Sequence, residues 1–265
     1  MIDLRNNQEF TRLIEANAPY WAAESEVISS YWTSGIRSLQ TDIKWIKHQL
    51  YKEYFDGIFS YTNLLNDVIS QTIKPSQLDS IITYANVIKE EAEHFSLFLS
   101  LISEIRSDYS SLEAKDLREA SDWPENQDLI SLRKDHIRLS NKVGLRASKF
   151  TEGGYVALFR EGKNIPIKSD IDIKISHTCG MILEDEFEHM ILGIADLSLA
   201  DFTELDWKLL TDFSVEQMKK RILMRNAQFS FPISDARLSM LLEGNAKPID
   251  FDYHLASSLL NSKCL

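Results

Sequence analysis

Two five-residue segments of this chain repeat one pattern: an acidic residue, Glu, any residue, Glu and His. The first segment is Glu90–His94 and the second is Asp185–His189. Each segment contains a Glu-x-x-His pair. On a helix, residues three positions apart lie on the same face, so the Glu and the His of one pair can bind one metal ion together. The repeat therefore predicts two long helices that carry metal ligands.

Both segments lie in sequence with a helical apolar period. The spacing of apolar residues predicts helices over 76–107 and 173–198. Glu91 and Glu186 interrupt the apolar faces of these helices. A buried, unpaired carboxylate is costly, so it must take up a proton, pair with a cation or bind a metal. We interpret both pairs as metal ligands rather than surface charges. The pairs are Glu91 with His94 and Glu186 with His189.

The spacing of apolar residues predicts helices in the rest of the chain as well. Nine Gly and six Pro are too few for a chain of many short strands and turns. No linker or low-complexity segment divides the sequence, so we predict one all-α domain over residues 1–265, with its metal-binding core at about 41–198. The further predicted helices cover 19–40, which opens near Pro19, then 41–73, 126–161, 204–227 and a short helix at 233–243.

A dinuclear carboxylate site needs more ligands than two Glu-x-x-His pairs supply. Such a site usually adds one carboxylate from each of two further helices. An antiparallel neighbouring helix places its ligand about as far from the connecting loop as the ligand it faces. For Glu91 this indicates Glu53, which lies on the apolar face of its helix, with Asp56 as the alternative on a more polar face. For Glu186 it indicates Glu152.

Two glycines follow Glu152 inside the predicted helix over 126–161. Gly153 and Gly154 are unusual there, because each Gly costs about 1 kcal/mol relative to Ala in a helix. They could leave space for oxygen or a substrate beside the metal, or they could allow close helix packing. The sequence leaves both interpretations open.

The charge balance excludes several classes of protein. The 29 basic and 40 acidic residues give a net charge of -11, which repels nucleic-acid phosphates and anionic membranes. No apolar run approaches the roughly 20 residues of a transmembrane helix, and the polar N-terminus has no signal-peptide pattern. The two cysteines form no CxxC pair. We therefore expect a cytoplasmic protein with no nucleic-acid or membrane partner.

The order Glu, Glu-x-x-His, Glu, Glu-x-x-His on four long helices resembles the ferritin-like diiron-carboxylate superfamily. This resemblance implies a ferritin-like four-helix bundle with extra N- and C-terminal helices. Glu93 and Glu188 stand where members often have Arg, whereas Glu90 and Asp185 keep the acid that often orients the histidine of the opposite motif. Carried over residue by residue, the six ligands are Glu53, Glu91, His94, Glu152, Glu186 and His189.

The resemblance also implies a function. It indicates a dinuclear metal oxidase or oxygenase that activates O2, the co-substrate, for reaction with a small organic molecule. The cofactor is two Fe ions, with Mn/Fe as the alternative. Further alternatives are a ferritin-like iron oxidation and storage protein, a heme-oxygenase-like diiron oxidase and a non-catalytic helical bundle. The added segments before residue 41 and after residue 198 suit a walled pocket better than a cage subunit.

The expected partners are a small-molecule substrate and an electron donor. The chain has no nucleotide fingerprint and no Cys cluster, so electrons come from an external donor or from the substrate itself. A homodimer is the assembly to test. The sequence leaves open which substrate is used and which reaction follows: hydroxylation, desaturation, C–C cleavage or N-oxygenation.

Overall fold

The computed structural model describes residues 2–70, 75–106, 117, 118, 120 and 123–263. All secondary structure within these ranges is helical, which confirms the all-α prediction. The chain divides into two compact units. Unit 1 comprises Met1–Arg37 and Trp123–Leu265, and unit 2 comprises Ser38–Asp122. The single domain over 1–265 and the ferritin-like bundle stay predictions. Within the described ranges, no helix combines the length and the apolar character needed to cross a bilayer.

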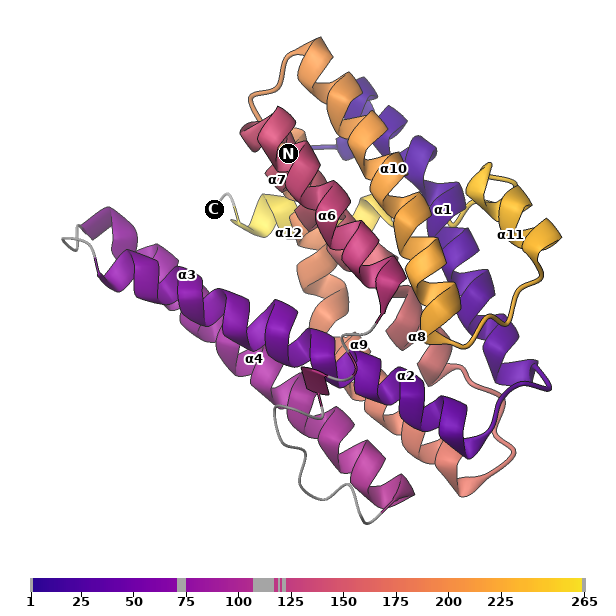
Figure 1. Cartoon of the computed structure of the whole chain (residues 1–265). Helices are drawn as coiled ribbons and strands as arrows, with labels where there is room; N and C mark the ends of the chain where they lie inside the picture. The colour runs from indigo at the N-terminus through magenta and orange to yellow at the C-terminus, as the bar shows by residue number, and fades with distance from the viewer. Residues whose placement is uncertain (1, 71–74, 107–116, 119, 121–122, 264–265) are drawn as a thin grey trace. The chain divides into compact units, whose positions relative to one another are not determined.

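Unit 2 is a long helical hairpin (Figure 1). Its first arm remains helical through three successive segments: α2 (Leu39–Tyr51), the π-helix η2 (Lys52–Phe59) and α3 (Ser60–Ile69). Its second arm is α4 (Pro75–Ile105). Ser38 and Thr41 form a capping box that starts α2. The predicted helices over 41–73 and 76–107 match these arms, although residues 71–74 lie outside the described ranges. The π-helical segment was not predicted.

Unit 1 contains eight helices whose bounds the structure describes. The predicted helices over 173–198, 204–227 and 233–243 are present with slightly different ends, whereas the last helix of the chain was missed. The helices are α1 (Gln8–Thr33), α6 (Pro124–Leu139), α7 (Asn141–Glu152), α8 (Ala157–Lys163), α9 (Asp170–Ala195), α10 (Glu204–Gln228), α11 (Asp235–Leu242) and α12 (Tyr253–Lys263). The short 3-10 turns are η1 (Leu4–Asn6), η4 (Gly154–Val156) and η5 (Asp196–Leu199).

The predicted start of the first long helix at Pro19 is wrong. Helix α1 begins at Gln8, where the Asn7 side chain accepts a hydrogen bond from the backbone N–H of Phe10 at 3.0 Å. Pro19 lies inside the helix. An interior proline normally disfavours a helix, so the sequence pattern placed the boundary there. The Asn7 cap and the buried side chains of α1 outweigh that local preference.

The predicted continuous helix over 126–161 is also wrong. The chain leaves the helical conformation at Ser140, whose side chain then caps α7 by accepting from the backbone N–H of Val143. A second interruption follows α7, where Gly154, Tyr155 and Val156 have φ angles of 51°, 54° and 49°. This left-handed conformation is costly for a β-branched residue such as Val156, so tertiary packing must hold it.

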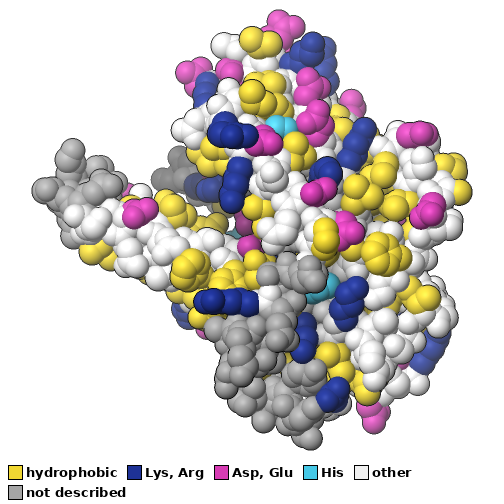
Figure 2. Space-filling view, viewed as in Figure 1, with side chains coloured by type: hydrophobic (Ala, Val, Ile, Leu, Met, Phe, Trp, Pro, Cys, Tyr) yellow, Lys and Arg dark blue, Asp and Glu magenta, His cyan; other side chains and the backbone are white. Residues whose placement is uncertain are grey.

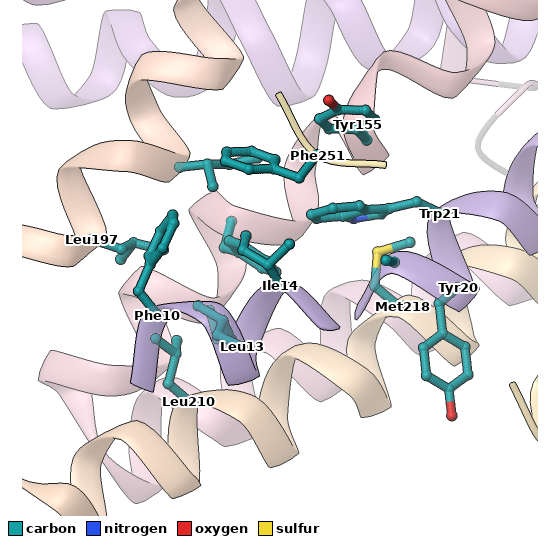
Figure 3. Close-up of a cluster of buried hydrophobic side chains, with 14 of the residues drawn as sticks. Phe10, Leu13, Ile14, Tyr20, Trp21, Tyr155, Leu197, Leu210, Met218 and Phe251 are labelled. Carbon is teal, nitrogen blue, oxygen red and sulfur yellow. The ribbon is translucent and has the colours of Figure 1, made fainter. Parts of the chain in front are cut away.

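An aromatic cluster in the core of unit 1 provides that packing (Figure 3). Trp21 of α1 is fully buried and stacks on Tyr155, with ring centroids 4.8 Å apart and an interplanar angle of 14°. Phe251, just before α12, contacts both rings. The left-handed turn is therefore fixed between the first helix of unit 1 and its C-terminal segment, and burial of these large rings stabilises the arrangement.

Candidate metal centre

Three of the six predicted ligands lie together in unit 2. Glu53 comes from η2, and Glu91 and His94 come from α4. One ligand atom from each side chain lies within 4.8 Å of the other two. Glu53 and His94 are 6% and 2% exposed, and Glu91 is half-buried. Within the described ranges, this is the one group of three carboxylate, imidazole or thiol side chains with such spacing.

The helical hairpin explains why these residues meet. Glu91 and His94 are three residues apart and so lie on one face of α4. That face packs against η2, which carries Glu53. The sequence pattern predicted this arrangement for half of the site: a Glu-x-x-His pair on one helix and a carboxylate on its antiparallel neighbour.

The structure places Glu53, and not Asp56, in this group. Asp56 is half-buried and pairs with Lys52, with Nζ and Oδ2 3.4 Å apart. The buried amide of Gln49 donates a hydrogen bond from Nε2 to Oε1 of Glu53 at 2.6 Å. This bond restrains the Glu53 carboxylate. Gln49 was not identified from the sequence, although its position four residues before Glu53 was a usable signal.

Gly57 makes room for the second carboxylate. A Cβ atom at this position would lie 2.5 Å from Oε2 and 2.7 Å from Cδ of Glu91. Any larger residue would therefore displace the Glu91 side chain. Gly57 and Glu53 both belong to the π-helical segment. Such segments are rare and occur frequently at functional sites.

Replacing Gly57 with Ala is expected to weaken metal binding without destabilising the metal-free protein. The new methyl group must push aside the flexible end of Glu91, whereas Ala favours a helix over Gly by up to about 1 kcal/mol. We expect the metal dissociation constant to rise roughly tenfold or more, comparable with losing a group that orients a ligand. Anaerobic Mn(II) or Fe(II) titration measures this constant.

The matched control for this variant is Gly193→Ala. Gly193 also lies inside a long helix, and a Cβ there would meet nothing within 4 Å. It should leave metal affinity unchanged. Equal affinities for Gly57→Ala and the unmodified protein would show that the position of Glu91 does not matter for binding.

The flanking residues of the first motif differ in burial. Glu90 is half-buried, whereas Glu93 is exposed and pairs with Lys89, with Nζ and Oε1 3.0 Å apart. Glu93 is therefore a surface residue. His48 of α2 is buried, and burial together with the nearby charge of Lys44 lowers its pKa to about 4, so its imidazole is neutral near pH 7.

The other three predicted ligands belong to unit 1. Glu152 ends α7 with an exposed side chain, and its backbone carbonyl accepts a hydrogen bond from Arg221. Glu186 is half-buried on α9, and His189 is exposed on the same helix. These residues do not form a second group with the close spacing found in unit 2. Their roles as ligands stay predictions.

Gly154, two residues after Glu152, is required by close packing and does not leave open space. A Cβ on Gly154 would lie 2.1 Å from Oε2 of Glu24 and 2.5 Å from Nε of Arg221. Its φ of 51° also favours glycine. The interpretation of this glycine as space for a substrate is therefore wrong, because a buried ion pair fills that volume.

No protein-family model matches the chain, and neither a curated protein nor a solved structure is similar to it at a significant level. Functional inference therefore depends on the chemistry of the side chains. Two carboxylates and one imidazole are hard oxygen and nitrogen donors that suit Fe(II), Mn(II) or Zn(II). Three protein ligands would also leave coordination positions on such an ion for water or another ligand.

Proposed function

We propose that the protein is a metal-dependent oxidase or oxygenase that uses O2 to oxidise a small organic molecule. The observation that carries this proposal is the group of Glu53, Glu91 and His94. Two ionised carboxylates balance the charge of one divalent cation, which explains why two acids can be accommodated in a largely buried site. A bound Fe or Mn ion would supply the redox chemistry that amino-acid side chains lack.

The protein's own contribution is to hold the ligands in place. Gln49 fixes one oxygen of Glu53, and Gly57 leaves the volume that the Glu91 carboxylate occupies. The Glu-x-x-His spacing presents Glu91 and His94 to the same ion. Such preorganisation would hold a bound ion by these three side chains and would leave positions on it for O2 and the substrate.

We extend the proposal to a dinuclear centre on the strength of the sequence repeat. Glu152, Glu186 and His189 would supply the second set of ligands, in keeping with the resemblance to ferritin-like diiron proteins. Metal stoichiometry tests this extension separately. One ion per chain would support the group in unit 2 and refute the second set, whereas two ions per chain would support both.

The deciding experiment is anaerobic reconstitution with Fe(II), metal counting and exposure to O2 with optical monitoring. An oxygenase or oxidase is expected to bind one or two ions per chain and to consume O2 in proportion to the bound metal. Iron storage would instead oxidise many Fe(II) ions per chain. A metal content near zero, or O2 consumption unaffected by His94→Ala, would refute the proposed function.

A further inference from the structure

The far end of the hairpin in unit 2 exposes an unusual number of apolar side chains. It comprises α3 and the adjoining part of α4, from Leu78 to Ile88. None of the side chains of α3 is buried. The large apolar residues exposed on this part of the hairpin are Leu64, Ile69, Leu78 and Ile82, and the exposed Phe59 lies next to it at the end of η2.

The two arms of the hairpin cannot cover these side chains by themselves. Helix α3 packs on α4, and the rings of Tyr61 and Tyr84 meet with centroids 6.1 Å apart. Both tyrosines remain only half-buried. Most of the stability of a helix in a protein comes from burying its apolar face against other elements. The exposed residues therefore mark a surface that gains stability from a further layer of helices.

The low charge of this segment indicates what kind of layer it suits. Between Gly57 and Ile88 the sequence has only three charged residues, Asp67, Lys74 and Asp79, whereas 26% of the whole chain is charged. On the side seen in Figure 2, the coloured side chains toward the far end of the hairpin are mostly apolar or uncharged, while acidic and basic side chains are scattered over unit 1. Loss of charge and gain of apolar area are typical of the buried core of a protein interface.

We propose that a second copy of this chain covers the surface, with the two hairpins packed against each other about a two-fold axis. The segment carries a net charge of only −1 (one Lys against two Asp), so two copies can meet there although each chain carries -11. The segment offers no cluster of charge that would select an acidic or a basic partner. Two hairpins together would form a four-helix layer that buries the apolar side chains of both.

The test is light scattering of the full chain after size-exclusion chromatography, over a range of concentrations. We expect a dimer of twice 30.5 kDa. Ile82→Glu should raise the dimer dissociation constant roughly 100-fold or more, because the new charge enters a two-fold interface twice. Ile82 is 58% exposed, so the substitution should not prevent folding. The control is Leu205→Glu on α10, whose side chain is 73% exposed in unit 1 and should leave the dimer intact.

Hydrogen exchange gives a second, variant-free test. The amides of residues 60–69 and 78–88 should become more protected as the concentration of the unmodified protein rises. A monomer at all concentrations would overturn the proposal, as would a dimer that persists in Ile82→Glu. Protection independent of concentration would also overturn it, since another part of the same chain would then cover the hairpin. These readouts need no metal, so they are independent of the proposed function.

Discussion

Replacing His94 with Ala is expected to abolish tight metal binding by unit 2. His94 is the one imidazole in the group with Glu53 and Glu91, and it is almost fully buried. Without it, two carboxylates would bind the ion with fewer and weaker bonds. The affinity should fall by more than the roughly 10- to 100-fold cost of losing a group that only orients a ligand. Anaerobic titration with Fe(II) or Mn(II) measures this loss directly.

Thermal melting provides a second measurement of the same effect. A ligand that binds only the folded state stabilises it by about 2.7 kcal/mol when its concentration is 100 times the dissociation constant. Metal should therefore raise the melting temperature of the unmodified protein and have little effect on His94→Ala. Glu93→Ala is the matched control, because Glu93 is the exposed neighbour that pairs with Lys89. If His94→Ala and Glu93→Ala respond equally to metal, the group in unit 2 is not a binding site.

The same assay applied to His189→Ala tests the second half of the predicted set. A drop from two ions to one would show that the second Glu-x-x-His pair binds metal. An unchanged stoichiometry would remove His189 from the ligand set while leaving the group in unit 2 in place.

Replacing Glu24 with Ala is expected to destabilise the protein by about 3–5 kcal/mol, the usual cost of removing one partner from a buried ion pair. Glu24 is fully buried, and its two carboxylate oxygens accept hydrogen bonds from Nε of Arg221 and Nε of Arg225, each at 2.8 Å. The variant would leave two buried guanidinium groups without their shared counter-charge. Chemical denaturation monitored by circular dichroism measures the loss.

Acid should weaken the same interaction. Burial by itself would raise the pKa of Glu24, but the charges and hydrogen bonds of Arg221 and Arg225 outweigh it, so the pKa lies below the ordinary value of 4.5. A lowered pKa in the folded state means that the carboxylate stabilises the protein above pH 4.5 and loses this effect as the pH falls through the folded-state pKa. The stability difference between the unmodified protein and Glu24→Gln should therefore shrink at low pH.

A neighbouring residue supplies the control for this prediction. Glu26 lies two residues further along α1 and binds Arg237 through both carboxylate oxygens, each at 2.7 Å. Both side chains are about one-third exposed, so Glu26→Ala should cost less than about 1 kcal/mol. A cost for Glu24→Ala as small as that for Glu26→Ala would mean that the buried pair contributes no more than a surface pair.

The sequence by itself determined the features that depend on residues close together in the chain. Apolar spacing located both arms of the hairpin, because a helix repeats every 3.6 residues. The Glu-x-x-His pattern placed Glu91 and His94 on one face of α4 for the same reason. Reflection about the connecting loop then indicated Glu53, since antiparallel helices pair residues equally far from their turn. Together these local rules predicted the three side chains that meet in unit 2.

Only the tertiary structure decided the features that depend on distant residues. The left-handed turn at Gly154–Val156 costs backbone energy that no local sequence rule offsets. The stacking of Trp21 on Tyr155 and the fit of Gly154 against Glu24 and Arg221 hold this turn in place. The partners of Glu24 are likewise about 200 residues away along the chain. Helical periodicity does not predict such contacts, because they depend on how helices pack against one another and not on the order of residues within one helix.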